Sequence, residues 1–239
     1  MHRRGFAVGG AVLACLFTLA APGAAQAAGL TLAVNTTADT HDSAPGDGVC
    51  ADSSGQCSLR AAIEESNAQP AGSAATVAVP AGTYKLTLGT LSVAANTITI
   101  TGAGPGKTIV KQNGSQAVAS VALGAKATLS QLALTGGGPG AQGGGLYNSG
   151  TASLSSVRVS SNTAASGAGI TNKAGATLTL TSATVSGNSV ASVAGSLPGG
   201  SAGGILNAGT LSISGGSISG NYAGPGGLGL SDTGGNGGN

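Results

Sequence analysis

A repeat in the second half of the chain limits the folds that this sequence can adopt. Three twelve-residue segments align without gaps, and a weaker fourth copy precedes them. The four segments span residues 126–137, 151–162, 177–188 and 210–221, and their last positions are 25, 26 and 33 residues apart. Each period contains about three short β-branched runs separated by Gly, Pro or Asn, and no helical pattern. The repeat predicts an all-β fold, a right-handed parallel β-helix with three strands in each coil.

Stacked coils would place like residues in columns along the helix axis, about 4.8 Å apart. The apolar residues Leu154, Leu180 and Ile213 share one position of the repeat, so we expect them to form an inward column. Asparagines occupy two further columns: Asn148, Asn172 and Asn207, and Asn162, Asn188 and Asn221. Such columns fit either a polar ligand-binding row or tight corners, where Asn tolerates the left-handed conformation and bonds to the neighbouring coil. We favour the second interpretation.

The first 27 residues have the pattern of a secretory signal peptide. Arg3 and Arg4 precede an apolar run, and an A-x-A cleavage motif ends at Ala27. The predicted mature protein is therefore secreted or attached to the cell surface, and it has no apolar stretch long enough for a transmembrane helix. The predicted organisation is a signal peptide (1–27), an N-terminal cap (28–72), a β-helix (73–223) and a Gly-rich tail (224–239), where the chain is either truncated or left frayed.

The predicted cap contains a cysteine pair and the one helical pattern of the mature chain. Cys50 and Cys57 form an even pair in an exported protein, so we expect a disulfide between them. An apolar helical face follows Ser58, a suitable N-cap residue, and Arg60 and Glu64 are spaced to pair with each other. A short helix with one apolar face must cover something, and the exposed end of a coil stack needs such a cap.

Acidic residues gather before the helix, at Asp39, Asp42, Asp47 and Asp52. Their oxygen atoms are the ligands that Ca²⁺ prefers, which makes them weak candidates for a metal site. Aspartates in a loop closed by a disulfide also form ordinary turns through hydrogen bonds to nearby backbone N–H groups. We favour the turn interpretation, and we expect neither a metal nor a cofactor.

The placement of charge argues against catalysis. No Asp, Glu or His lies between Glu65 and Asp232. Glycoside hydrolysis normally needs two carboxylates, a calcium-assisted lyase needs several, and a serine nucleophile needs a base. Arg158 alone could abstract a proton, but nothing in the sequence positions it. We therefore predict no catalytic residue and no enzymatic activity.

The net charge excludes one class of partner. Lys and Arg total nine and Asp and Glu seven, but Arg3 and Arg4 lie in the predicted signal peptide. The mature chain therefore balances seven basic residues against seven acidic ones, which gives no electrostatic footprint for nucleic acid.

Several motifs resemble known families. The segments 34–39 (VNTTAD), 45–50 (PGDGVC) and 57–63 (CSLRAAI) resemble the CSLREA-type N-terminal region of bacterial surface proteins. The segments 80–84 (PAGTY) and 100–104 (ITGAG) resemble coil openings of pectin-lyase-like β-helices, and the Gly-Gly-x-x-Asn repeats resemble those of chlamydial polymorphic outer-membrane proteins. Ala61 stands where the motif has Glu, which leaves the capping box incomplete. The resemblance implies a secreted or surface-displayed scaffold.

The function expected from the sequence is that of a non-catalytic scaffold with an adhesive or structural role. The alternative is a carbohydrate-binding or carbohydrate-cleaving protein with a pectin-lyase-like fold. The sequence does not identify a partner; surface glycans and other surface proteins fit this expectation, and nucleic acid does not.

Overall fold

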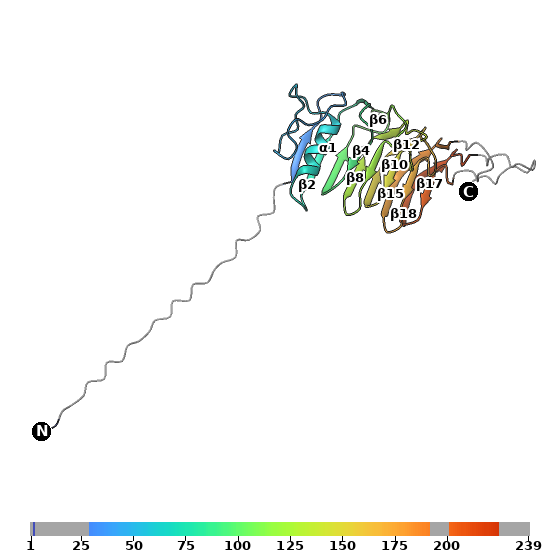
Figure 1. Ribbon diagram of the computed structural model, residues 1–239. Helices are drawn as coiled ribbons and strands as arrows, with labels where there is room; N and C mark the ends of the chain where they lie inside the picture. Colours follow the sequence, from blue (N-terminus) through green and yellow to red (C-terminus); the bar gives the residue numbers. More distant parts are fainter. Residues whose placement is uncertain (1, 3–28, 192–200, 225–239) are drawn as a thin grey trace, which may run out of the picture.

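Every strand pair that the structure describes is parallel, and the strands stack along one axis as the coils of a β-helix (Figure 1). The computed structural model describes residue 2 and residues 29–191 and 201–224. Apart from residue 2, the predicted signal peptide lies outside these residues, as does most of the predicted tail. Within them, no helix combines the length and the apolar character needed to cross a membrane. The predicted parallel β-helix is confirmed.

The first ladder of strands contains the first half of each repeat. Its strands are β1 (Leu30–Ala33), β2 (Ala74–Ala78), β5 (Thr97–Thr101), β8 (Lys126–Ser130), β11 (Thr151–Ser155) and the first halves of β15 (Thr177–Ser186) and β18 (Thr210–Ser219). Leu154 lies beside Leu180, and Leu180 lies beside Ile213. The column predicted from the repeat is therefore confirmed.

The second ladder follows the first after a tight corner. Its strands are β3 (Gly82–Leu86), β6 (Thr108–Gln112), β9 (Ala133–Thr135), β12 (Arg158–Ser160) and the second halves of β15 and β18. Because β15 and β18 continue through the corner, the two ladders form one 11-stranded sheet. The corner residue is left-handed, with φ of 52° at Ser156, 50° at Ser182 and 71° at Gly215. A left-handed residue therefore forms this corner in each of these three coils.

The third ladder closes the coils. Its strands are β4 (Leu91–Val93), β7 (Ala119–Val121), β10 (Leu146–Asn148), β14 (Ile170–Asn172) and β17 (Ile205–Asn207). A two-stranded pair, β13 (Thr163–Ala164) and β16 (Ser189–Val190), lies between the second and third ladders in the chain. Middle residues of the third ladder, such as Ser120 and Tyr147, occupy one column. The flanking residues of these strands point into the core.

Inward side chains of the three ladders form a single apolar core. Leu146, Ile170 and Leu178 are fully buried in it. The last described coil differs, because Ile213 and Ile218 occupy inward columns and yet are 47% and 49% exposed. The apolar columns are therefore covered within the stack and open at the β18 end of the described residues.

The helix α1 (Leu59–Ala68) covers the other end of the stack, where Figure 1 shows it beside β2 and β4. Ser58 is its N-cap, and the Ser58 Oγ accepts a hydrogen bond from the Ala61 amide at 3.0 Å. The apolar face buries Leu59 and Ile63 in the core of the coils. The predicted capping helix is confirmed.

Replacing Leu180 by Ala removes a side chain that is 1% exposed between Leu154 and Ile213. We expect a loss of about 2–5 kcal/mol in the free energy of unfolding, measured by urea denaturation. The adjacent Thr181 is exposed, so Thr181→Ala should change the free energy by less than about 0.5 kcal/mol. Equal losses in the two variants would contradict the inward orientation of the Leu180 column.

Candidate functional site

The first asparagine column lies inside the third ladder. Asn148, Asn172 and Asn207 are in register, and they follow Val93 and Val121 in the same column. Asn148 donates from Nδ2 to the Asn172 Oδ1 at 2.8 Å, and Asn172 donates likewise to Asn207 at 2.7 Å. The same two amides also donate to backbone oxygens of the following coil, those of Thr177 and Thr210. The column is a chain of amides bonded to one another.

The second column, Asn162, Asn188 and Asn221, follows the second ladder. Asn162 donates from Nδ2 to the Asn188 Oδ1 at 2.9 Å, and Asn188 donates likewise to Asn221 at 2.8 Å. Each Oδ1 of Asn188 and Asn221 also accepts a backbone N–H from the preceding coil.

One detail of the asparagine prediction is wrong. None of the six residues has a positive φ; the left-handed residue of the second column is the preceding one, with φ of 55° at Ser161, 63° at Gly187 and 60° at Gly220. The turn is therefore made one residue earlier, which leaves the Asn side chain free to point inward. Asn148, Asn172 and Asn188 are 0% exposed, so these amides are out of reach of a ligand.

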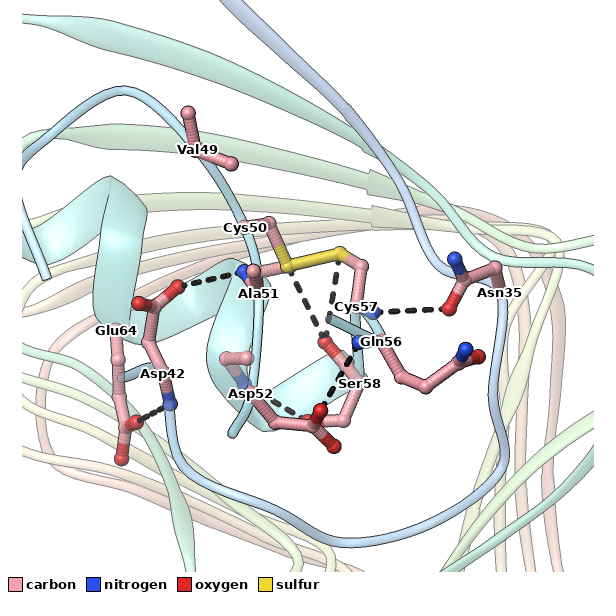
Figure 2. The surroundings of a disulfide bond; sticks show 12 residues. Asn35, Asp42, Val49, Cys50, Ala51, Asp52, Gln56, Cys57, Ser58 and Glu64 are labelled. Carbon is pink, nitrogen blue, oxygen red and sulfur yellow. Dashed lines mark hydrogen bonds between the residues drawn. A yellow bond between two sulfur atoms is a disulfide. The ribbon is translucent and has the colours of Figure 1, made fainter. Parts of the chain in front are cut away.

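The disulfide predicted in the cap is present. Figure 2 shows Cys50 and Cys57 joined beside the start of the helix, with an S–S distance of 2.02 Å. The Cys57 amide donates to the Asn35 Oδ1 at 2.9 Å, which ties the loop to the segment that follows β1. The bridge therefore holds the acidic loop against the end of the stack.

The four aspartates do not converge. Asp42 accepts from the Ala44 and Ala51 amides, and Asp52 accepts from the Ser54 and Gln56 amides. Figure 2 shows the bonds from Ala51 and Gln56. No group of three or more metal-ligating side chains occurs in the described part of the chain. Hydrogen bonds from Gln56 and Ser54 outweigh the opposing effect of desolvation and lower the pKa of Asp52. These carboxylates act as acceptors for the turns of the loop.

Asp47 accepts from the Val49 amide at 2.8 Å in the same way. A further acceptor in this loop is Glu65, which sequence reasoning missed. Glu65 is fully buried and accepts from the Gly46 and Gly48 amides. The sequence shows that Glu65 lies on the helix away from its apolar face, but it carries no other signal that this carboxylate is buried and accepts hydrogen bonds from the loop.

The predicted pairing of Arg60 with Glu64 is wrong. Arg60 donates from Nε to the Asp39 Oδ1 at 2.7 Å, and the two side chains are 7% and 4% exposed. Asp39 also accepts from the Thr87 and Leu88 amides, so one carboxylate links the cap to the first coil. Glu64 accepts instead from the His41 ring and the Asp42 amide. The buried partner 21 residues away displaces the neighbouring one on the helix surface.

The environment of Asp39 favours its charged form. Burial acts to raise the pKa of this carboxyl, but hydrogen bonds from Arg60, Leu88 and Thr87 together outweigh it. The pKa of Asp39 therefore lies below its ordinary value of 3.8.

Arg158 is exposed and lines a hollow of about 460 Å³ at the second ladder. Its Nη2 donates to the Pro105 carbonyl oxygen, and Ser156, Ser182 and Thr184 line the same hollow. No carboxylate or imidazole accompanies it, because the sequence has none between residues 65 and 232. The surroundings of Arg158 therefore offer hydroxyl groups but no acid or base partner.

A second open hollow, of about 470 Å³, lies on the outer surface of the third ladder. Its lining residues are Thr90, Gln116, Ala117, Ser120, Gly140, Ala141, Gln142 and Tyr147. Sequence reasoning missed this hollow, because most of its lining residues lie in loops outside the strands of the repeat. The available signal was Tyr147, the one aromatic residue in a column whose other repeat members are Thr171 and Leu206.

Replacing Asn172 by Ala interrupts the first asparagine column and leaves the Thr210 oxygen without its donor. We expect a loss of about 1–3 kcal/mol in the free energy of unfolding, because buried polar partners lose their hydrogen bonds. Asn113 is exposed, so Asn113→Ala is the matched control and should change the free energy by less than about 0.5 kcal/mol. An Asn172 variant as stable as the control would show that the column is not needed for stacking.

Replacing Asp39 by Asn should lower the free energy of unfolding at pH 7 by about 3–5 kcal/mol, because Arg60 loses its buried partner. The folded pKa of Asp39 is depressed, so its contribution is full above the unfolded value of about 3.9 and is lost as pH falls through the folded value. The difference between the two proteins should therefore shrink below about pH 4 in denaturation measured across pH. Asp47→Asn is the control, since Asp47 is exposed. A difference that stays constant down to pH 2 would contradict the role of the charge.

Comparison with known proteins identifies no relative. No family model, no curated protein and no solved structure matches this chain. The resemblance to CSLREA-type and pectin-lyase-like proteins stays a prediction.

Proposed function

We propose that this protein is a non-catalytic, exported β-helix that serves outside the cell or at its surface as an adhesive or structural scaffold. The observation that carries the proposal is the use of polar side chains inside the stack. The buried amides of Asn148, Asn172 and Asn188 bond to neighbouring coils, so the polar groups most distinctive of the repeat hold coils together. A repeat devoted to stacking suits a rigid spacer.

The charge distribution supports the absence of catalysis. The described coils carry Lys and Arg side chains but no Asp, Glu or His, so no pair of groups there could act as acid and base. The exposed Arg158 has hydroxyl neighbours only. Nucleophilic catalysis by one of the many serines would need a base that the coils lack.

Export is supported by two independent features. Residues 1–27 have the composition of a signal peptide, and Cys50 and Cys57 form a disulfide. Disulfides persist in oxidising compartments and are rare in the cytosol of mesophiles. A bridge that pins the cap of the stack suits a protein that works outside the cytosol.

Carbohydrate binding is a second candidate function, and the hollow beside Tyr147 favours it. An aromatic ring, two glutamine amides and two hydroxyl groups face the same open space. This candidate is compatible with the first, because a scaffold that binds glycans is an adhesin.

Expression of the full chain in a bacterial host should give a mature protein that begins at Ala28, is found outside the cytoplasm and contains no free thiol. The purified mature protein should release no product from a panel of neutral and acidic polysaccharides, measured by reducing ends and by unsaturated products. Arg158→Ala should leave this result unchanged.

A chain that lacks residues 2–27 is the control for export and should stay in the cytoplasm. Full-length protein retained in the cytoplasm would contradict export. Turnover of a polysaccharide that disappears in the Arg158→Ala variant would contradict the non-catalytic proposal.

A further inference from the structure

We infer that the hollow on the third ladder, lined by Gln116, Ser120, Gln142 and Tyr147, binds an uncharged sugar unit of a surface glycan. The inference rests on the proposed scaffold function and names the class of ligand for it. The volume of about 470 Å³ lies in the range of small-molecule sites, about 300–1,000 Å³. The hollow is open to solvent, so a unit within a longer glycan could enter it from the side.

Tyr147 supplies an aromatic surface at one wall. Its neighbours in the outward column are Ser120 in the preceding coil and Thr171 in the following one, and both are small. The Lys173 ammonium lies 5.7 Å from the centroid of the Tyr147 ring. Lys173 directly follows β14, so this contact comes from the following coil. The hollow lies toward Ser120, on the side of the preceding coil. A cation–π contact with Lys173 therefore holds a ring that also lines the hollow.

Aromatic rings are scarce in this chain, so a tyrosine that lines a hollow is a notable candidate for stacking on a sugar ring. The chain has three Tyr, two Phe and no Trp, and both Phe lie in the predicted signal peptide. Of the other tyrosines, Tyr84 is buried and Tyr222 is 57% exposed at the far end of the described coils. An aromatic face with its negative quadrupole attracts the C–H groups on the apolar face of a sugar ring.

The polar groups of the hollow match sugar hydroxyls. The Gln116 Oε1 accepts from the Thr90 amide at 3.1 Å and from the Thr90 Oγ1 at 3.3 Å, which fixes the orientation of the amide. Gln116 and Gln142 add their side-chain amides to the lining of the hollow, and Ser120 adds its hydroxyl group. Donors and acceptors thus face the space together, as a ligand with hydroxyl groups that both donate and accept requires.

The absence of charge from the lining favours a neutral sugar over an acidic one. None of the lining residues is ionised at neutral pH. The Lys173 ammonium contacts the Tyr147 ring and does not belong to the lining of the hollow. A carboxylate placed in the hollow would lose water without gaining a charged partner among the lining residues, which costs free energy.

The test is a titration of the mature full chain, followed by NMR, with cellotriose, chitotriose and maltotriose as neutral probes and trigalacturonate as the acidic probe. We expect saturable shifts from at least one neutral probe at the side chains of Gln116, Gln142 and Tyr147. Tyr147→Ala should weaken that affinity about tenfold, because the stacking surface is lost. Tyr147→Phe should retain it within about threefold, because the ring remains. Tyr222→Ala is the matched control and should bind as the unaltered protein does.

Three results would overturn the inference: no saturable binding of any neutral probe, unchanged affinity in Tyr147→Ala, or binding of trigalacturonate alone. Thermal unfolding of each variant shows whether the β-helix is intact, and Tyr147→Phe tests the ring without a large change of volume. The scaffold proposal is tested separately by export and turnover, so failure of sugar binding would leave it standing, whereas cleavage of a probe would contradict it.

Discussion

The structure depends on the hydrogen bonds that run between coils. A single coil of three short strands cannot bury its apolar side or satisfy its corner amides, and only the next coil in register supplies both. The asparagine columns show this dependence. The side-chain amide of Asn148 donates a hydrogen bond to Asn172 in the next coil, and that of Asn162 donates to Asn188. A shift of one residue would separate these amides and also turn the apolar columns outward.

Close stacking explains the unusual composition. Glycine accounts for 45 of the 239 residues, and several glycines lie where a neighbouring coil leaves no room for a side chain. A Cβ on Gly150 would lie 2.5 Å from the Ala125 carbonyl oxygen and closer still to that of Ala122. Such contacts exclude every other residue type at these positions, so part of the glycine content reflects coil spacing. The same demand for small residues leaves few aromatic rings, and therefore an outward ring such as Tyr147 stands apart from its surroundings.

Much of the fold could be predicted, because the alignment of the repeats gives the register between strands of successive coils. Segments aligned in the sequence, such as those holding Leu154 and Leu180, are neighbours in space. Local patterns failed where a partner came from a distant part of the chain. Arg60 binds Asp39 instead of Glu64, because burial against the first coil strengthens the distant pair. The hollow beside Tyr147 escaped prediction for the same reason, since stacking brings loop residues of different coils together beside Ser120 and Tyr147.

The most direct test of this account is the proximity of the stacked side chains in solution. In mature protein labelled at Leu, Ile and Val methyl groups, nuclear Overhauser effects should connect Leu129 with Leu154, Leu154 with Leu180, and Leu180 with Ile213. Direct effects between Leu129 and Ile213 should be absent, because two coils separate them. Missing effects between adjacent members of this column, or effects that link it to outward residues, would contradict the parallel β-helix on which the proposed function rests.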